Sequence, residues 1–171
     1  MTSLDTIDRP FGAPLTRAGD ERPIMGVDPG MYGGIAFLYE SGVVVACDIP
    51  LVGPDVDVGE LVRLMRERKP YLAALERAGA FPKQGVASTF RYGVAVGCIR
   101  GAIAACEVPL ELVSPAKWKG HFRLSKDKEL ARGLAQRFWP GTGFFARKMD
   151  HGRAEAALIA KYVLETANRR S

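Results

Sequence analysis

The sequence has 171 residues, of which 47% are hydrophobic and 25% are charged, and its formal net charge is +5. This length suits a single domain with an ample core, and no segment holds the ~18 consecutive apolar residues that a membrane span requires. We therefore expect no membrane partner, whereas the positive charge permits a polyanionic one. Residues 1–20 contain prolines and no signal-like hydrophobic stretch, so we predict a flexible tail there and one domain over residues 21–171.

The first predicted element is a β-hairpin over residues 24–38. An apolar run over 24–27 ends at Asp28, where Pro29 and Gly30 break the strand, and a second apolar run over 35–38 follows a glycine pair. Asp28 thus lies where a buried strand ends. Taken alone, it is equally well explained as an aspartate that accepts hydrogen bonds from turn amides.

Further elements follow from apolar runs, helical periodicity and proline positions. A strand over 71–75 stops at Glu76, and the proline-free segment 86–106 is rich in Ala, Gly and Val, typical of one long helix. Other strands are predicted over 43–49 and 110–113, and other helices over 60–68, 127–139 and 151–168. This order indicates a mixed α/β sheet with helices on its faces.

Acidic side chains recur at the ends of these elements. Glu76 follows a strand as Asp28 does, and Glu155 lies in the first turns of the last helix, on the same face as His151 (i, i+4). Asp150 is either the N-cap of that helix or a further ligand, and both roles stay open. Acids that converge at one sheet edge raise each other's pKa, and divalent cations remove that conflict. Two Mg²⁺ ions in such a site stabilise both oxygens of a phosphodiester displacement.

The three cysteines indicate a reducing compartment. Cys47, Cys98 and Cys106 are odd in number, match no zinc-binding spacing and lie in or beside apolar segments. Buried, reduced thiols are the expected state, which is typical of a cytoplasmic protein.

Three motifs in this order resemble the RuvC-type Holliday junction resolvases of the ribonuclease H-like superfamily. They are G-V-D-P-G-M-Y-G-G around Asp28, L-E-R around Glu76, and D-H-G-R-A-E-A-A-L-I-A from Asp150 onwards. The last motif, with W-K at Trp118-Lys119 and S-K-D at residues 125–127, is most similar to the chloroplast resolvases of plants and their bacterial relatives.

The resemblance implies a fold, an activity and partners. The fold is an α/β, ribonuclease H-like mixed five-stranded sheet with three antiparallel strands followed by parallel strands, flanked by helices. The activity is that of a homodimer that cuts four-way junction DNA with paired, symmetric nicks, using Mg²⁺ or Mn²⁺, with two ions per active site. The implied location is the nucleoid of a bacterial or phage-infected cytoplasm.

The resemblance also assigns residues. Asp28, Glu76 and Glu155 match metal ligands, and His151 or Asp150 would complete the set, because the aspartate that bacterial members place three residues before the last acid is Gly152 here. Helix geometry favours His151, although a nitrogen ligand suits Mn²⁺ better than Mg²⁺; orienting the attacking water is its alternative role.

Cationic and aromatic residues complete the candidate site. Lys126 matches a lysine near the scissile phosphate, where it would stabilise developing charge. In the loop after Glu76, Phe81 would stack on unpaired bases at a junction centre. The remaining candidates for contacts to the DNA backbone are Arg77, Lys83, Lys117, Lys119, Arg123, Lys128, Arg147 and Lys148.

Three other functions are compatible with parts of this sequence. An actin-like ATPase also uses an Asp-x-Gly turn, but it needs a second similar domain for which 171 residues leave no room. A DNA-binding module without catalysis would gain only repulsion from three retained carboxylates. A ribonuclease H-like nuclease that cuts flaps or hybrids needs one site, whereas symmetric junction cutting needs two. The small residues of segment 86–106 would let another helix approach closely, either within the monomer or from a partner chain. The symmetry of junction cutting favours the partner chain and therefore a dimer.

Overall fold

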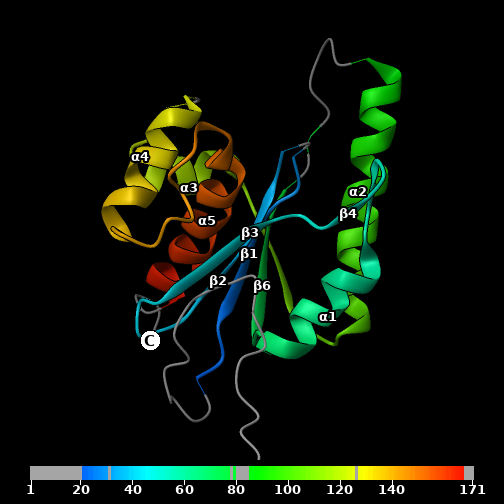
Figure 1. Ribbon diagram of the computed structural model, residues 1–171, viewed down its shortest axis with the longest axis horizontal. Coiled ribbons are helices and arrows are strands. Elements are labelled where there is room, and N and C mark those ends of the chain that lie inside the picture. The colour runs from blue at the N-terminus through cyan, green and yellow to red at the C-terminus, as the bar shows by residue number, and fades with distance from the viewer. Residues whose placement is uncertain (1–20, 31, 78, 80–84, 126, 168–171) are drawn as a thin grey trace, which may run out of the picture.

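The computed structural model describes residues 21–30, 32–77, 79, 85–125 and 127–167. Its centre is a five-stranded sheet with the order β3-β2-β1-β6-β7 (Figure 1). The strands are β1 (Ile24–Asp28), β2 (Gly34–Leu38), β3 (Val44–Asp48), β6 (Leu72–Glu76) and β7 (Leu110–Val113). β1, β2 and β3 pair antiparallel, whereas β6 and β7 continue the sheet in parallel. The expected mixed topology, with three antiparallel strands followed by parallel ones, is confirmed.

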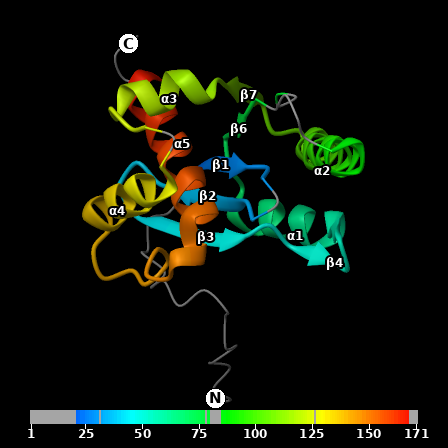
Figure 2. The same ribbon diagram turned by 90° about the horizontal axis from the view of Figure 1, so that it is seen from above.

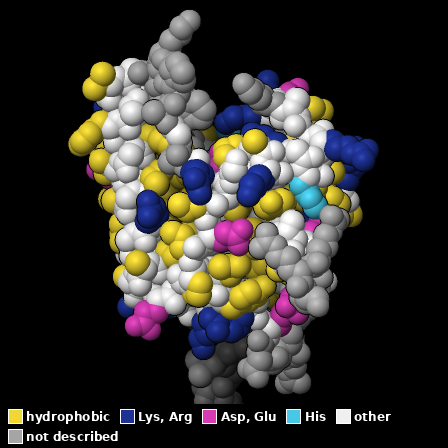
Figure 3. Space-filling view, turned by 180° about the vertical axis from the view of Figure 1, so that it is seen from behind, with side chains coloured by type: hydrophobic (Ala, Val, Ile, Leu, Met, Phe, Trp, Pro, Cys, Tyr) yellow, Lys and Arg dark blue, Asp and Glu magenta, His cyan; other side chains and the backbone are white. Residues whose placement is uncertain are grey.

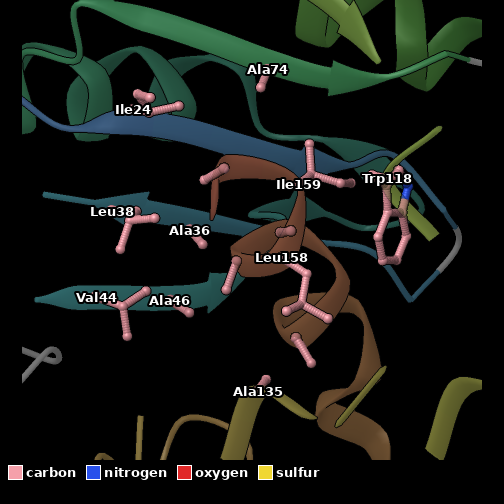
Figure 4. Close-up of a cluster of buried hydrophobic side chains, with 14 of the residues drawn as sticks. Ile24, Ala36, Leu38, Val44, Ala46, Ala74, Trp118, Ala135, Leu158 and Ile159 are labelled. Carbon is pink, nitrogen blue, oxygen red and sulfur yellow. The ribbon is translucent and has the colours of Figure 1, made fainter. Parts of the chain in front are cut away.

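Helices cover both faces of this sheet (Figure 2). α1 (Val58–Arg68) and α2 (Val86–Ala105) lie on one face, and α3 (Pro115–His121), α4 (Lys128–Phe138) and α5 (His151–Ala167) lie on the other. Each face has its own hydrophobic core. Figure 4 shows the core on the α5 side, where Leu158 and Ile159 pack over Ala36, Ala46 and Ala74 of the sheet. None of the helices in the described segments is long and apolar enough to cross a membrane.

The strand register brings two acidic side chains to the same edge of the sheet. Val27 of β1 lies opposite Leu75 of the parallel strand β6. Asp28 and Glu76 are the next residues and the last of their strands. Because neighbouring parallel strands end at the same edge, the two carboxylates emerge side by side, at the upper end of the sheet in Figure 1.

Glycines allow α5 to lie directly on β1 and β2. A Cβ atom on Gly26 of β1 would lie 2.0 Å from the carbonyl oxygen of Ala156 in α5, and one on Gly34 of β2 would lie 2.5 Å from the amide nitrogen of Arg153. From the helix side, a Cβ on Gly152 would lie 2.0 Å from the carbonyl oxygen of Tyr32. Side chains at these positions would push the helix away from the sheet. The glycines therefore set the distance between α5 and the strand that carries Asp28.

Two features differ from the sequence-based expectation. The strand predicted over 110–113 is β7, but the residues after it form a helix that was not predicted, α3, whose first residue is Pro115, a position where the missing amide of proline costs nothing. A short hairpin, β4 (Leu51–Val52) and β5 (Asp55–Val56), follows β3 where no strand was predicted; its turn includes Gly53 at a φ of 59°. A 3₁₀ turn, η1 (Lys148–Asp150), precedes α5. The predicted tail over 1–20 lies outside the described residues.

Candidate active site

Asp28 is buried at the end of β1, with 7% of its surface exposed. Its Oδ1 accepts a hydrogen bond of 3.0 Å from the amide of Gly30, in the turn created by the Asp-Pro-Gly sequence. Burial, together with the negative charges of Glu155 and Glu76, raises the pKa of Asp28 to about 7. Because burial and neighbouring acids disfavour the ionised carboxylate, a cation beside Asp28 would stabilise that form.

Glu76 ends β6 and has a specific hydrogen-bond donor. The indole Nε1 of Trp118 in α3 donates to Oε2 of Glu76 over 2.7 Å. Burial raises the pKa of Glu76, the Trp118 hydrogen bond lowers it, and the charge of Glu155 raises it further. The raised pKa reflects a carboxylate that is partly removed from water and lies within reach of a second acid.

Glu155 comes from α5 and is 5% exposed. Its Oε1 accepts a hydrogen bond of 2.9 Å from Nζ of Lys119, the residue after Trp118. Consecutive residues of α3 thus contact two of the three predicted carboxylates. The structure brings Asp28, Glu76 and Glu155 to one edge of the sheet from three separate elements.

Asp150 and His151 have different surroundings. Asp150 is fully buried and accepts hydrogen bonds from both the backbone amide and the guanidinium of Arg147, at 2.7 to 3.0 Å, with Arg153 at 3.6 Å. Burial raises its pKa, but the hydrogen bonds from Arg147 outweigh this and the net shift is downward. The Asp150 carboxylate is thus committed to joining η1 to the start of α5.

His151 faces the acidic edge. Burial, and then the charge of Lys128, lowers its pKa, while Glu155 opposes them. Its Nδ1 is buried and has no hydrogen-bond partner among the described residues, and its ring meets that of Tyr32 edge to face at 6.4 Å. A neutral imidazole with an unpartnered buried nitrogen is suited to accept a hydrogen bond or bind a cation.

The position three residues before Glu155 cannot hold a side chain. Gly152 forms a parallel bridge with Gly33, and a Cβ on it would collide with the backbone of the loop after Asp28. This explains the departure from the resolvase motif noted in the sequence. Close backbone packing occupies the space in which an aspartate would stand.

The donor set fits a divalent cation in its chemistry. Carboxylate oxygens are the ligands that Mg²⁺ prefers. The pKa of Asp28 is raised by burial and by repulsion from Glu155 and Glu76, and a cation would relieve both. Within the part of the chain that the structure describes, no three His, Cys, Asp or Glu side chains lie close enough together to form a ready-made metal cluster. Lys119 already supplies a positive charge to Oε1 of Glu155, so a cation bound by Glu155 would compete with this lysine for that oxygen.

The candidate DNA-binding cations fall into two groups. Lys119 is half-buried beside Glu155, and the charge of Lys128 acts on Asp28, Glu76 and His151, so both lie at the acidic edge. The others are exposed, and one of them, Arg147, binds Asp150; they are Arg77, Lys117, Arg123, Arg147 and Lys148. Phe81, Lys83 and Lys126 lie outside the described residues. Figure 3 shows Lys and Arg side chains spread over the upper half of the rear face, with hydrophobic side chains between them.

Sequence reasoning assigned no role to three aromatic residues of this region. Tyr92 of α2 faces the acids from the other side of the sheet: burial and the charges of Asp28 and Glu76 raise its pKa to about 12. Tyr32 is 70% exposed beside His151, and Trp118 binds Glu76. Tyr32 could have been found from its place in the Asp-Pro-Gly loop, but no local pattern connects Trp118 to Glu76, which lies 42 residues earlier.

Comparison with solved structures identifies the architecture. A structure of Thermus thermophilus RuvC in complex with a Holliday junction substrate matches with a TM-score of 0.61 and 16% sequence identity, over 85% of this chain and 96% of that one. The chain has the RuvC fold. A second structure of Thermus thermophilus RuvC gives a TM-score of 0.60 and 17% identity over 84% of this chain and 96% of the other. The RuvC fold is ribonuclease H-like, as the sequence motifs implied. Neither protein-family models nor curated proteins match this sequence.

Proposed function

We propose that the protein is a metal-dependent endonuclease that resolves four-way DNA junctions by paired, symmetric nicks. The observation that carries the proposal is the gathering of Asp28, Glu76 and Glu155 at one edge of a RuvC-like sheet, where burial and mutual repulsion raise the pKa of Asp28 to about 7. A buried acidic cluster is costly for a protein that only binds DNA. Its retention supports catalysis. The match to a RuvC solved with a Holliday junction substrate supports the choice of substrate.

The residues at the acidic edge would have different roles. Asp28, Glu76 and Glu155 supply oxygen ligands for Mg²⁺ or Mn²⁺, and the bound ions, two per site, would stabilise the entering and leaving oxygens of the phosphodiester. The lowered pKa of His151 favours the neutral imidazole, which can accept a hydrogen bond from the attacking water and orient it. Asp150 takes no direct part, because Arg147 already binds its carboxylate.

The cations would act on the substrate. Lys128 influences the acids while its side chain remains exposed, so it can contact the scissile phosphate and stabilise the charge that develops there. Lys126, outside the described residues, is a second candidate for this role. The exposed Arg77, Lys117, Arg123 and Lys148 would bind the DNA backbone, which predicts an affinity that falls steeply with salt.

Paired nicks require two copies, and α2 offers a surface for the second one. Val86, Phe90 and Val94 are spaced four residues apart on one face of α2 and are 88%, 71% and 42% exposed. Gly97 and Gly101 continue that face, and a Cβ built on either meets no described atom within 4 Å. An apolar face with small residues permits close contact with the same helix of a second copy around a two-fold axis.

One substrate panel tests the proposal. Four-way junction, linear duplex, flap and RNA–DNA hybrid of matched sequence are incubated with Mg²⁺ or Mn²⁺ and with wild-type protein, Glu155→Gln or Glu40→Gln. We expect symmetric nicks in the junction alone, lost in Glu155→Gln while junction binding persists. Glu40 is exposed in the turn after β2, at the opposite end of the sheet, and its variant should cut normally.

Other outcomes would overturn parts of the proposal. Cleavage of hybrids or flaps by a protein that sediments as a monomer, both free and with junction bound, would indicate a single-site nuclease. Binding to junctions with no cleavage in either metal would indicate a DNA-binding module.

A further inference from the structure

Trp118 is fully buried in the core on the α5 side of the sheet, yet its indole reaches the acidic edge. Figure 4 shows it at the end of the core cluster, beside the end of β1. The apolar part of the ring packs into this cluster, and Nε1 donates to Oε2 of Glu76 over 2.7 Å. One side chain thus links core packing to the orientation of a candidate ligand.

Buried tryptophans usually find a partner for their N–H group, so a hydrogen bond alone would not be informative. The second tryptophan of the chain shows the ordinary solution: Nε1 of Trp139 donates to the backbone carbonyl oxygen of Gly42 over 3.0 Å. Trp118 differs because its acceptor is a carboxylate whose negative charge belongs to the candidate site. Trp139 therefore provides a matched control within the same core.

The chemistry of the donor matters as much as its position. Lys119 places a positive charge beside Glu155, and this charge competes with a metal ion for Oε1. An indole N–H only donates a hydrogen bond and carries no positive charge. Trp118 therefore holds Oε2 of Glu76 without competing with a cation for the charge of the carboxylate. The hydrogen bond also favours the ionised form of Glu76, against the effect of burial. Oε1 of Glu76 remains available to bind a cation.

We propose that Trp118 is a positioning residue that holds Glu76, through its Nε1–H, in the orientation required to bind a divalent cation. This inference rests on the proposed function and adds to it a partner outside the direct ligands. Such partners orient metal-binding side chains, and their loss commonly costs 10–100-fold in metal affinity.

The test measures Mn²⁺ binding by titration calorimetry on the full chain without DNA, so that it does not depend on cleavage. Trp118→Phe removes the N–H group and keeps an aromatic ring, and we expect Mn²⁺ to bind about tenfold more weakly. Trp139→Phe removes the matched hydrogen bond and should bind Mn²⁺ as the wild-type protein does. Glu76→Gln identifies the measured site, and we expect it to weaken binding more than Trp118→Phe does.

Trp118→Phe also shortens a fully buried side chain, so a second variant separates packing from hydrogen bonding. In the Trp139→Phe background, Trp118 is replaced by benzothienylalanine, in which sulfur stands in place of the N–H group in a ring of nearly the same shape. 5-Fluorotryptophan at the same position keeps the N–H group. We expect the first analogue to weaken Mn²⁺ binding and the second to leave the affinity for Mn²⁺ unchanged. The two proteins should have similar melting temperatures.

The possible results are distinguishable. Wild-type affinity in the benzothienyl protein would overturn the role of Trp118 and leave the proposed function intact. Equal weakening by both analogues would show that Trp118 acts only through packing, which also overturns it. Two results would overturn the metal site and with it the proposed function. One is a wild-type protein that binds no Mn²⁺, and the other is a Glu76→Gln variant that binds Mn²⁺ as tightly as the wild type.

Discussion

Small residues serve opposite purposes in α2 and α5. In α5 and the strands below it, a Cβ on Gly26, Gly34 or Gly152 would overlap backbone atoms, so the glycines are consumed in packing within the chain. In α2, Gly97 and Gly101 face open space and the exposed side chain of Phe90 lies on the same face. A run of small residues in a helix therefore predicts that another element packs closely against it, but it does not identify that element. For α5 the partner is the sheet; for α2 we propose a second copy of the chain.

The largest effect is expected where the packing of α5 is broken. Gly26→Val places a branched side chain where the carbonyl oxygen of Ala156 already lies, and we expect a loss of more than about 4 kcal/mol or failure to fold. The same replacement at Gly97 should change stability by less than about 1 kcal/mol, since valine is at least as good in a helix as glycine. Thermal and urea unfolding of the two variants checks this. Comparable losses would remove the contrast between the two helices.

The next effect is electrostatic and follows from the burial of Asp28 at the end of β1, beside the charge of Glu155 on α5. The pKa of Asp28 is raised from 3.8 to about 7 in the folded protein. Its carboxyl therefore holds a proton more tightly when folded, so stability falls as pH rises from about 4 to 7. Asp28→Asn removes this cost, and we expect it to be more stable than wild type by up to about 4 kcal/mol at pH 8, with the advantage gone near pH 4.

Melting temperatures of both proteins between pH 4 and 8, without divalent metal, test this expectation. Asp55→Asn, which changes an exposed acid on β5, serves as the control and should show no such trend. An advantage for Asp28→Asn that is the same at every pH would contradict the electrostatic cause.

A smaller effect is expected at the start of α5, where two neighbouring residues should separate. Asp150→Ala removes the hydrogen bonds from Arg147 and should lower stability by roughly 1–2 kcal/mol. Cleavage should remain. His151→Ala should keep most of the stability and lose most of the cleavage. Unfolding curves and junction cleavage of both variants give the comparison; equal loss of cleavage with unchanged melting temperatures would show that both residues act in catalysis.

The smallest effect on monomer stability is expected on the open face of α2. Phe90 is 71% exposed, so Phe90→Ser should change the stability of one chain by no more than about 0.5 kcal/mol. The same change should weaken a dimer that uses this face. Sedimentation velocity across a micromolar concentration series measures it, with Leu130→Ser on α4, also exposed, as the control. Equal sedimentation of wild type and Phe90→Ser as dimers would place the interface elsewhere.

Much of the fold was predictable because its signals are local. The apolar runs that end at Asp28 and Glu76, the periodicity of α1 and α4, and the proline-free α2 all lie within single segments. α3 was not predicted because Ser114-Pro115 after a strand is compatible both with a loop and with the start of a helix. Which of the two occurs depends on Trp118, whose burial against the sheet and α5 gives the short helix its stability.

The sequence by itself determined the order of the elements and the acids at their ends, because periodicity and chain-breaking residues act over a few positions. Only the tertiary structure decided how these acids are used. It committed Asp150 to Arg147, left Nδ1 of His151 without a partner among the described residues, and excluded a side chain at position 152. It also placed Trp118 on Glu76 and Lys119 on Glu155. These contacts depend on the distance between α5 and β1 and on the direction of α3, which long-range packing sets and no local pattern encodes.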